Sequence, residues 1–213
     1  MPARLLVEGM RRLADLGLTQ GRSGNLSVRI ASGFMITPSG IPAEHLDAKD
    51  MVIMDLDGHA QGDLPPSSEW RMHRDLYRAF PRAGAVVHAH PPHATALACR
   101  REAIPPFHYM VAVAGGADIP CADYATFGTY ALSANAIKAL RGRTACLLAN
   151  HGILCYSNDI ERGIDLALEV ETLARQYLLA QQNGEPVLLD PQEMDEIIDR
   201  FKHYGSASIR VRG

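Results

Sequence analysis

The sequence has few cysteines, and none of them form the close pairs typical of redox or metal sites. Its 213 residues include four cysteines, and no two of them have C-x-x-C spacing. A chain of this length can bury a hydrophobic core without disulfides. We therefore expect one domain over residues 1–213 with reduced, mostly buried thiols at Cys99, Cys121, Cys146 and Cys155.

An excess of positive charge is missing as well. The 21 Lys and Arg residues are offset by 24 Asp and Glu residues, which gives a formal net charge of −3. Proteins that bind a phosphate backbone need a broad basic field, so nucleic acid is not expected as a partner. Neither G-x-G-x-x-G nor G-x-x-x-x-G-K-[ST] occurs, which excludes the usual Rossmann and P-loop signatures.

Long apolar segments are also absent. The longest stretch without Asp, Glu, Lys or Arg spans residues 83–99, and histidines and prolines interrupt it. It is too short and too polar to cross a bilayer. Residues 1–17 carry charges at helical intervals and lack the apolar core of a signal peptide. These features predict a cytoplasmic protein without a membrane partner.

Hydrophobic periodicity predicts a chain in which strands alternate with helices. Strands are expected at 25–30, 33–37, 51–55, 85–90, 144–149 and 153–156. Helices are expected at 5–16, from Ser67 or Ser68 to 80, at 92–98, 132–140 and 160–182, and from 191 onward. Residues 104–128, rich in Pro, Gly and Ala, allow no assignment.

Two histidines have the spacing of metal ligands on a strand. His88 and His90 are two residues apart, so their side chains point to the same face and can converge on one ion. His151 is the best third candidate, because Gly152 beside it allows a close backbone approach. Three imidazoles suit Zn²⁺ and leave a position for substrate. With nine histidines in the chain, an H-x-H pair taken alone is more often made of ordinary core or surface residues than of metal ligands.

Three short segments offer hydroxyl and backbone N–H groups. Residues 65–69, Pro-Pro-Ser-Ser-Glu, stand at a predicted helix start with Glu69 in the first turn, where a phosphate is stabilised. Ordinary N-capping is the commoner use of serine at such a position. Residues 24–27 and 37–40 are plain turns when each is taken alone.

Taken together and in order, these segments resemble the class II aldolase and adducin superfamily. The matching residues are 24–27, 37–40, 67–69, 88–90 and 150–152. Segments 66–71, 104–110, 119–128 and 201–205 are further similar to the branch that cleaves L-fuculose 1-phosphate. The resemblance extends over nearly the whole chain.

The resemblance implies a fold, an assembly and a site. The fold is a three-layer α/β/α domain with a mainly antiparallel central sheet, and the assembly is a homotetrameric ring with sites between subunits. Zn²⁺ would be held by His88, His90, His151 and Glu69, with Glu69 also acting as the catalytic acid/base. The substrate phosphate would be bound by Gly24, Asn25, Ser39, Gly40, Ser67 and Ser68.

Two tyrosines complete the site that the resemblance implies. Tyr109 and Tyr204 match tyrosines that the family brings into the site from a neighbouring subunit or from the C-terminal segment. A phenol such as that of Tyr109 suits proton transfer at the hydroxyl of the aldehyde half. Residues 104–128 and the tail after Tyr204 are expected to line that end of the pocket.

The implied activity is zinc-dependent cleavage of a ketose 1-phosphate, a small-molecule sugar phosphate, to dihydroxyacetone phosphate and an aldehyde. A divalent metal can stabilise the carbanion that is left, so no Schiff-base lysine is needed. Related alternatives are another sugar-phosphate aldolase, a methylthioribulose-phosphate dehydratase and a pentulose-phosphate 4-epimerase, although the epimerases carry aspartate where Glu69 stands. A non-catalytic adducin-like module would not need the histidines. The aldehyde is left open, because one methyl group is worth only about 1–3 kcal/mol in a pocket.

Overall fold

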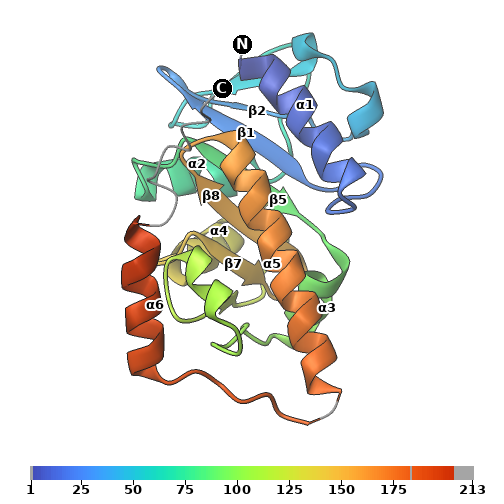
Figure 1. Cartoon of the computed structure of the whole chain (residues 1–213). Helices are drawn as coiled ribbons and strands as arrows, with labels where there is room; N and C mark the ends of the chain where they lie inside the picture. The colour runs from blue at the N-terminus through green and yellow to red at the C-terminus, as the bar shows by residue number, and fades with distance from the viewer. Residues whose placement is uncertain (1, 183, 204–213) are drawn as a thin grey trace, which may run out of the picture.

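The computed structural model describes residues 2–182 and 184–203, which form an eight-stranded sheet between two layers of helices (Figure 1). The strand order is β4-β3-β2-β1-β5-β8-β7-β6. Neighbouring strands are antiparallel except for β6 and β7, which are parallel. The predicted three-layer α/β/α arrangement with a mainly antiparallel sheet is therefore confirmed. The strands are β1 Asn25–Ile30, β2 Gly33–Ile36, β3 Val52–Met54, β4 Ala60–Gln61, β5 Ala85–Ala89, β6 Cys121–Ala122, β7 Ala145–Leu148 and β8 Gly152–Ser157.

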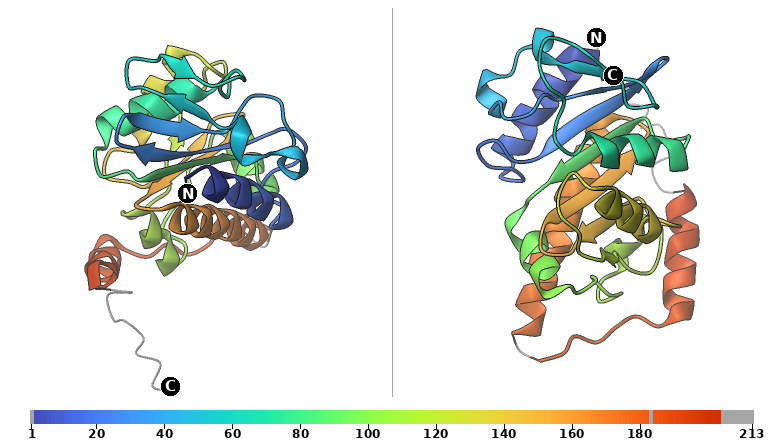
Figure 2. Two further views of the ribbon diagram at one scale, coloured as in Figure 1. Left: turned by 90° about the horizontal axis from the view of Figure 1, so that it is seen from above. Right: turned by 180° about the vertical axis from the view of Figure 1, so that it is seen from behind.

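The helices divide between the two faces of the sheet. One face packs against α1 (Pro2–Asp15), α3 (Pro92–Arg100) and α5 (Ile160–Gln181), which bury leucines and valines over it. The other face packs against α2 (Trp70–Ala79) and α4 (Tyr130–Ala139). These two helices lie nearest the viewer in the right-hand view of Figure 2. Each helix therefore buries one apolar stripe against the sheet, as amphipathic helices do.

The fully buried strand β5 shows how the two faces are kept apart. Val87 belongs to the core beneath α1 and α5, whereas Val86 belongs to the core beneath α2 and α4. Because side chains alternate along a strand, His88 points to the same face as Val86. The start of α2 lies over that face, so the alternation places His88 beside Glu69, the N-cap residue of α2.

The start of α2 differs from the prediction. The helix begins at Trp70, so Glu69 is its N-cap residue and does not lie in the first turn. An isolated bridge pairs Pro38 with Pro66, and the Ser67 N–H donates to the carbonyl of Thr37 at 3.1 Å. This pairing between distant residues keeps the backbone extended up to Ser67. The sequence gives no sign of it, because Ser67 and Ser68 look like ordinary helix-capping residues.

Several short elements lie in segments without a usable sequence pattern. They are the two-residue strands β4 and β6 and the 3₁₀ helices η1 (Ala43–His45), η2 (Ala48–Asp50) and η3 (Tyr109–Ala114). The last helix, α6 (Pro191–His203), begins where predicted. Its capping residue Asp190 accepts from the Glu193 N–H at 2.9 Å, and Glu193 accepts from the Asp190 N–H at 2.8 Å. Helix α6 packs against η3.

All four cysteines are free thiols, as predicted. Only two of them, Cys146 and Cys155, are buried, so the expectation that most would be buried was too broad. Among residues 2–182 and 184–203, no helix combines the length and apolarity needed to span a membrane.

One carboxylate of α5 holds the start of α3. The Glu171 carboxylate accepts from the backbone N–H groups of His93 at 3.0 Å and Ala94 at 2.9 Å, and from the His93 ring at 2.6 Å. The N-cap residue of α3, Pro91, has no side chain that could satisfy these helical N–H groups. Glu171 of α5 therefore caps the N-terminus of α3, a helix that begins two residues after His90.

We expect Glu171→Ala to lower the free energy of unfolding by about 2 kcal/mol, because it leaves two helical N–H groups unpaired and removes a charge from the helix N-terminus. Urea unfolding measures this loss. Glu169→Ala on the same helix is the matched control, and its effect should stay within about 0.5 kcal/mol. Equal losses in the two variants would contradict the capping role.

Candidate active site

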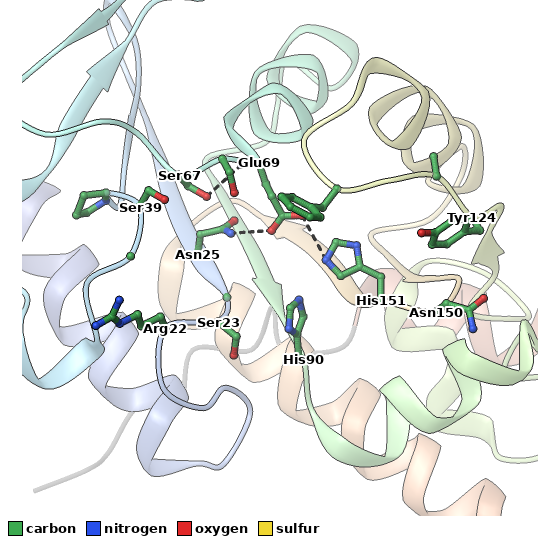
Figure 3. A pocket seen from close by; sticks show the side chains of 16 residues that line it. Arg22, Ser23, Asn25, Ser39, Ser67, Glu69, His90, Tyr124, Asn150 and His151 are labelled. Carbon is green, nitrogen blue, oxygen red and sulfur yellow. Dashed lines mark hydrogen bonds and ion pairs between the residues drawn. The ribbon is translucent and has the colours of Figure 1, made fainter.

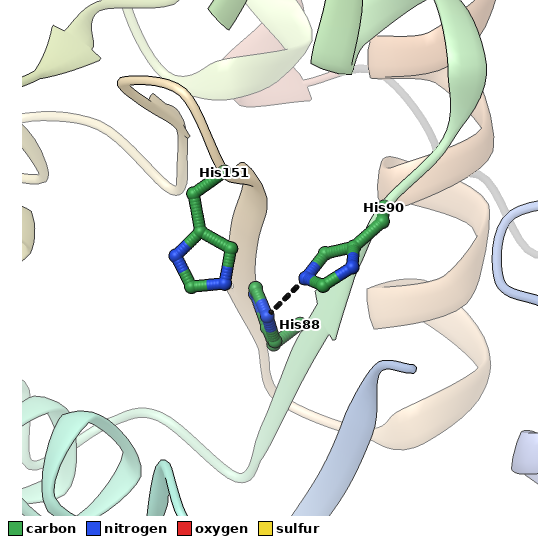
Figure 4. Close-up of side chains that lie close together, drawn as sticks. All are labelled: His88, His90 and His151. Atoms are coloured by element: carbon green, nitrogen blue, oxygen red, sulfur yellow. Dashed lines mark hydrogen bonds between the residues drawn. The ribbon is translucent and has the colours of Figure 1, made fainter. Parts of the chain in front are cut away.

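Three histidines converge from two neighbouring antiparallel strands (Figure 4). His88 lies in β5, His90 follows the end of that strand, and His151 lies in the tight turn between β7 and β8. The Nε2 atoms of His88 and His90 are 2.9 Å apart. One ring nitrogen from each of the three side chains lies within 4.8 Å of the others. The structure thus brings together the three histidines among the four predicted metal ligands.

The turn that presents His151 depends on two backbone features. Asn150 adopts a left-handed conformation with φ of 54°, which asparagine tolerates better than most residues. A Cβ at Gly152 would lie 2.4 Å from the carbonyl oxygen of Ala89 and 2.6 Å from Cδ2 of His90. Only glycine lets the turn approach β5 this closely, and the approach places His151 beside His90.

The geometry of the cluster fits a divalent cation. His88 donates from Nδ1 to the carbonyl of Ile153 at 2.8 Å, which leaves Nε2 facing the cluster, as in many metal-binding histidines. Two imidazole nitrogens on one tetrahedral zinc ion would be about 3.3 Å apart for Zn–N bonds of about 2.0 Å, close to the separation of His88 and His90. Glu69 Oε1 is buried and has no hydrogen-bond partner among the described residues. That oxygen is 3.3 Å from His151 Nε2.

Burial and charge set the protonation of the cluster. Burial, together with the nearby charge of His88, lowers the pKa of His90 to about 3 and that of His151 to about 4. Both rings are therefore neutral at neutral pH, the state in which imidazole binds a metal. Burial also opposes a charge on His88, but the adjacent Glu69 carboxylate outweighs it and raises the His88 pKa.

Glu69 turns its side chain from the start of α2 into this cluster. Its Oε2 is 2.9 Å from His88 Nε2 and accepts a hydrogen bond from Asn25 Nδ2 at 3.0 Å. Burial works against ionisation, yet His88 and His151 outweigh it and hold the pKa of Glu69 below its ordinary value. Glu69 is therefore an ionised carboxylate in a nearly enclosed position, with only 6% of its surface exposed.

A pocket of about 370 Å³ reaches the cluster, since His90 and His151 form part of its lining (Figure 3). This volume suits a small phosphorylated sugar. Its walls include all six residues that the resemblance assigns to the substrate phosphate, together with Glu69, His90 and His151. His88 lies beneath the pocket and is fully buried.

The end of the pocket formed by the predicted phosphate-binding residues is built from tight backbone turns. Gly24 has φ of 77°, and a Cβ there would lie 2.8 Å from Thr19 Oγ1 and 3.0 Å from the His88 carbonyl oxygen. Gly40 has φ of 76°. Gly24 is therefore required both by its left-handed backbone and by the close approach of its neighbours, whereas at Gly40 the left-handed backbone alone favours glycine.

Some lining residues were not predicted as site residues. They are Arg22, Ser23, Pro38, Tyr124, Ala125, Phe127 and Asn150. Arg22 stands beside Gly24 in the sequence, and its positive charge was the available signal for an anion site. Tyr124 and Phe127 come from residues 104–128, the segment expected to line the aldehyde end.

Neither of the two tyrosines expected from the resemblance is among the residues that line this pocket in the part of the chain described. Tyr109 begins η3, is 51% exposed and lies beside Ile197 of α6, outside the walls of the pocket of its own chain. Tyr204 lies outside the described residues. A contribution of Tyr109 to catalysis would therefore have to come from another subunit.

Comparisons with known proteins agree with this geometry. Residues 4–178 match the model of the Class II Aldolase and Adducin N-terminal domain. The chain is 48% identical over 200 residues to a 5-methylthioribulose-1-phosphate/5-deoxyribulose-1-phosphate aldolase of Rhodospirillum rubrum, covering 94% of this chain and 90% of the relative. It is 45% identical over 205 residues to the L-fuculose phosphate aldolase of Escherichia coli K12, covering 95% of each chain. A solved L-fuculose 1-phosphate aldolase superposes with a TM-score of 0.91 at 43% identity, covering 94% of this chain and 96% of that one.

Alanine at His88, His90 or His151 should abolish stoichiometric binding of a divalent metal, because two imidazoles hold the ion too weakly. Elemental analysis of the desalted protein, after loading with zinc, measures the metal content. His45→Ala, an exposed histidine in η1, is the control and should bind zinc like the parent. A full equivalent of zinc in any of the three cluster variants would show that the ligand set is wrong.

Proposed function

The chain belongs to the class II aldolase and adducin family, and we propose that it cleaves a ketose 1-phosphate to dihydroxyacetone phosphate and an aldehyde. One observation carries the proposal. The predicted phosphate-binding residues, the Glu69 carboxylate and two histidines of the metal cluster line a single pocket. A phosphate group and a metal-activated carbonyl separated by one carbon would both find partners there.

The metal in this proposal is zinc, held by His88, His90 and His151, with Glu69 adjacent. A divalent ion at this position supplies a Lewis acid for the negative charge that develops on the ketone oxygen as the bond between C3 and C4 breaks. Three neutral or neutralisable imidazoles and one carboxylate suit zinc, which prefers nitrogen and oxygen donors in this combination.

The substrate phosphate binds at the other end of the pocket. Ser67 and Ser68 precede the first turn of α2, where the backbone N–H groups and the helix dipole favour an anion. Ser39 and Gly40 face them from the loop after β2, and Arg22 adds a positive charge. These contacts fix C1 of the sugar and so determine which carbons reach Glu69.

Glu69 is the group that moves the proton on carbon. In the condensation direction, the ionised carboxylate takes a proton from the hydroxymethyl carbon of dihydroxyacetone phosphate. In cleavage, the electron pair of the broken bond stays on C3, and Glu69 delivers to that carbon a proton that it has first taken up from solvent. The Asn25 amide holds the carboxylate in place through its 3.0 Å hydrogen bond.

The C4 hydroxyl must lose its proton as the bond breaks. The proposal assigns this step to Tyr109 of a neighbouring subunit in a homotetrameric ring, whose phenol oxygen accepts this proton while its own proton passes to solvent. Its exposure, and its position outside the pocket of its own chain, support a role across an interface. Sites of this kind would be completed only by assembly.

Two substrate classes differ only in the aldehyde half. L-fuculose 1-phosphate, the substrate to which the sequence segments point, would release lactaldehyde. The Rhodospirillum relative favours the second class, because its name includes 5-deoxyribulose 1-phosphate and 5-methylthioribulose 1-phosphate. Those sugars would release acetaldehyde and methylthioacetaldehyde. The aromatic walls formed by Tyr124 and Phe127 suit a methyl or methylthio end, and Asn150 offers a polar partner for a hydroxyl.

Incubation of the zinc-loaded protein with these three ketose 1-phosphates should release dihydroxyacetone phosphate, detected by coupled reduction, and kcat/KM ranks the substrates. Glu69→Gln is the matched control, which should fold and bind phosphate but lose about 100-fold or more in kcat. Loss of water without dihydroxyacetone phosphate would favour the dehydratase, and epimerised sugar would favour the epimerase. Release by Glu69→Gln within a few-fold of the parent would remove Glu69 from proton transfer.

The shared site predicts complementation between two inactive variants. Glu69→Gln and Tyr109→Phe chains should each be poorly active alone, yet co-expressed mixed rings should recover activity. For random mixing in a head-to-tail ring, about one site in four would contain both intact residues. Verified hybrid oligomers without any recovery would place Tyr109 outside the neighbouring site.

A further inference from the structure

Behind Glu69, a continuous series of buried polar side chains runs away from the pocket. Asn25 Nδ2 is 3.0 Å from Glu69 Oε2, and Asn25 Oδ1 is 2.5 Å from His73 Nε2. On the other side of the ring, His73 Nδ1 is 2.7 Å from Ser27 Oγ, which is 2.9 Å from the Tyr77 hydroxyl. None of these five residues is more than 6% exposed. We call this series the buried relay.

The buried relay follows from the periods of two elements. Glu69 is the N-cap residue of α2, and His73 and Tyr77 follow it at intervals of four residues, so the three side chains point to the same side. Asn25 and Ser27 are two residues apart and lie on the facing side of β1. Along the buried relay, side chains from α2 or its N-cap therefore alternate with side chains from β1. Polar residues at these positions occupy places that apolar residues fill elsewhere in the same interface.

The donors in the buried relay all point in one direction. The Glu69 carboxylate only accepts, so the Asn25 NH₂ group must face it and the Asn25 carbonyl oxygen must face His73. His73 Nε2 must then carry the proton. Burial and the charge of His88 lower the pKa of His73 to about 3, so its ring is neutral and Nδ1 accepts from Ser27. The hydroxyl of Tyr77, whose pKa burial raises, donates to Ser27 in turn.

We propose that His73 is a positioning residue for Glu69, which it orients through Asn25. By donating from Nε2, His73 fixes the Asn25 amide with its NH₂ toward the carboxylate. With the amide reversed, two acceptor oxygens would meet at the 3.0 Å that now separates Asn25 Nδ2 from Glu69 Oε2, and the carboxylate would have to rotate away. The inference rests on the proposed function, because the orientation of Glu69 matters for moving a proton at C3.

Different substitutions of His73 separate a positioning role from simple core packing, because only a positioning role requires a hydrogen-bond donor at Nε2. Glutamine can place its own NH₂ group where His73 Nε2 lies and donate to Asn25. Phenylalanine fills the same space without a donor or an acceptor, so Asn25 Oδ1 and the Ser27 hydroxyl lose their hydrogen bonds to the ring. Met72, the neighbouring residue of α2, is buried in the same core but has no place in the buried relay. Met72→Ala therefore reports what loss of stability alone does to turnover.

The experiment compares His73→Phe, His73→Gln and Met72→Ala in the zinc-loaded enzyme, with the substrate that the parent cleaves best. His73→Phe should lose about tenfold or more in kcat, which corresponds to about 1.4 kcal/mol in the barrier, with KM within about threefold of the parent. His73→Gln should keep kcat within about threefold, and so should Met72→Ala despite its lower stability. Parental kcat in a folded His73→Phe variant, or equal losses in all three, would overturn the proposal.

A second readout does not depend on turnover. Nitrogen-15 NMR of the ring-labelled parent should show His73 neutral near pH 7, with the proton on Nε2. A proton on Nδ1, or a charged ring, would overturn the proposal even if the His73 variants did not fold. If the parent released no dihydroxyacetone phosphate, the proposed function would fail by itself, and the ring signal would still decide whether the buried relay has this direction.

Discussion

A carboxylate enclosed by imidazoles is the constraint on which the rest of the structure depends. An ionised group with 6% exposure, as at Glu69, is costly to bury unless charges and donors surround it. Its partners come from three places in the chain: Asn25 on β1, His88 on β5 and His151 in the turn before β8. These strands are neighbours in the centre of the sheet. The start of α2 must therefore dock over that centre.

The hydrophobic cores explain the layers but not this docking. Apolar side chains of α2 pack on the sheet and would tolerate some sliding along it, because hydrophobic contact has little direction. The hydrogen bonds of Asn25, Ser27 and His73 fix the registration between α2 and β1. The polar groups thus contribute specificity of position, while the apolar groups contribute most of the stability.

The sequence predicted those parts of the site that depend on local periods. Alternation along residues 85–90 indicated His88 and His90, and the resemblance supplied the order of the other segments. The start of α2 was predicted too early, because the pairing of Pro38 with Pro66 joins residues far apart in the sequence. His73 gave no signal, since a single histidine in an amphipathic helix looks like any other core or surface residue. Its partners appear only when α2 and β1 are placed face to face.

The segment that carries Tyr124 and Phe127 is attached to the fold differently from the histidine cluster. It lies between β6 and α4, and its two aromatic side chains are 53% and 64% exposed. The histidines and Glu69, by contrast, are fixed by the central strands and the start of a helix. Replacements in the exposed segment therefore leave the reactive groups where they are. Under the proposed function, such a layout would let related chains differ in the aldehyde they release while keeping the groups that break the bond.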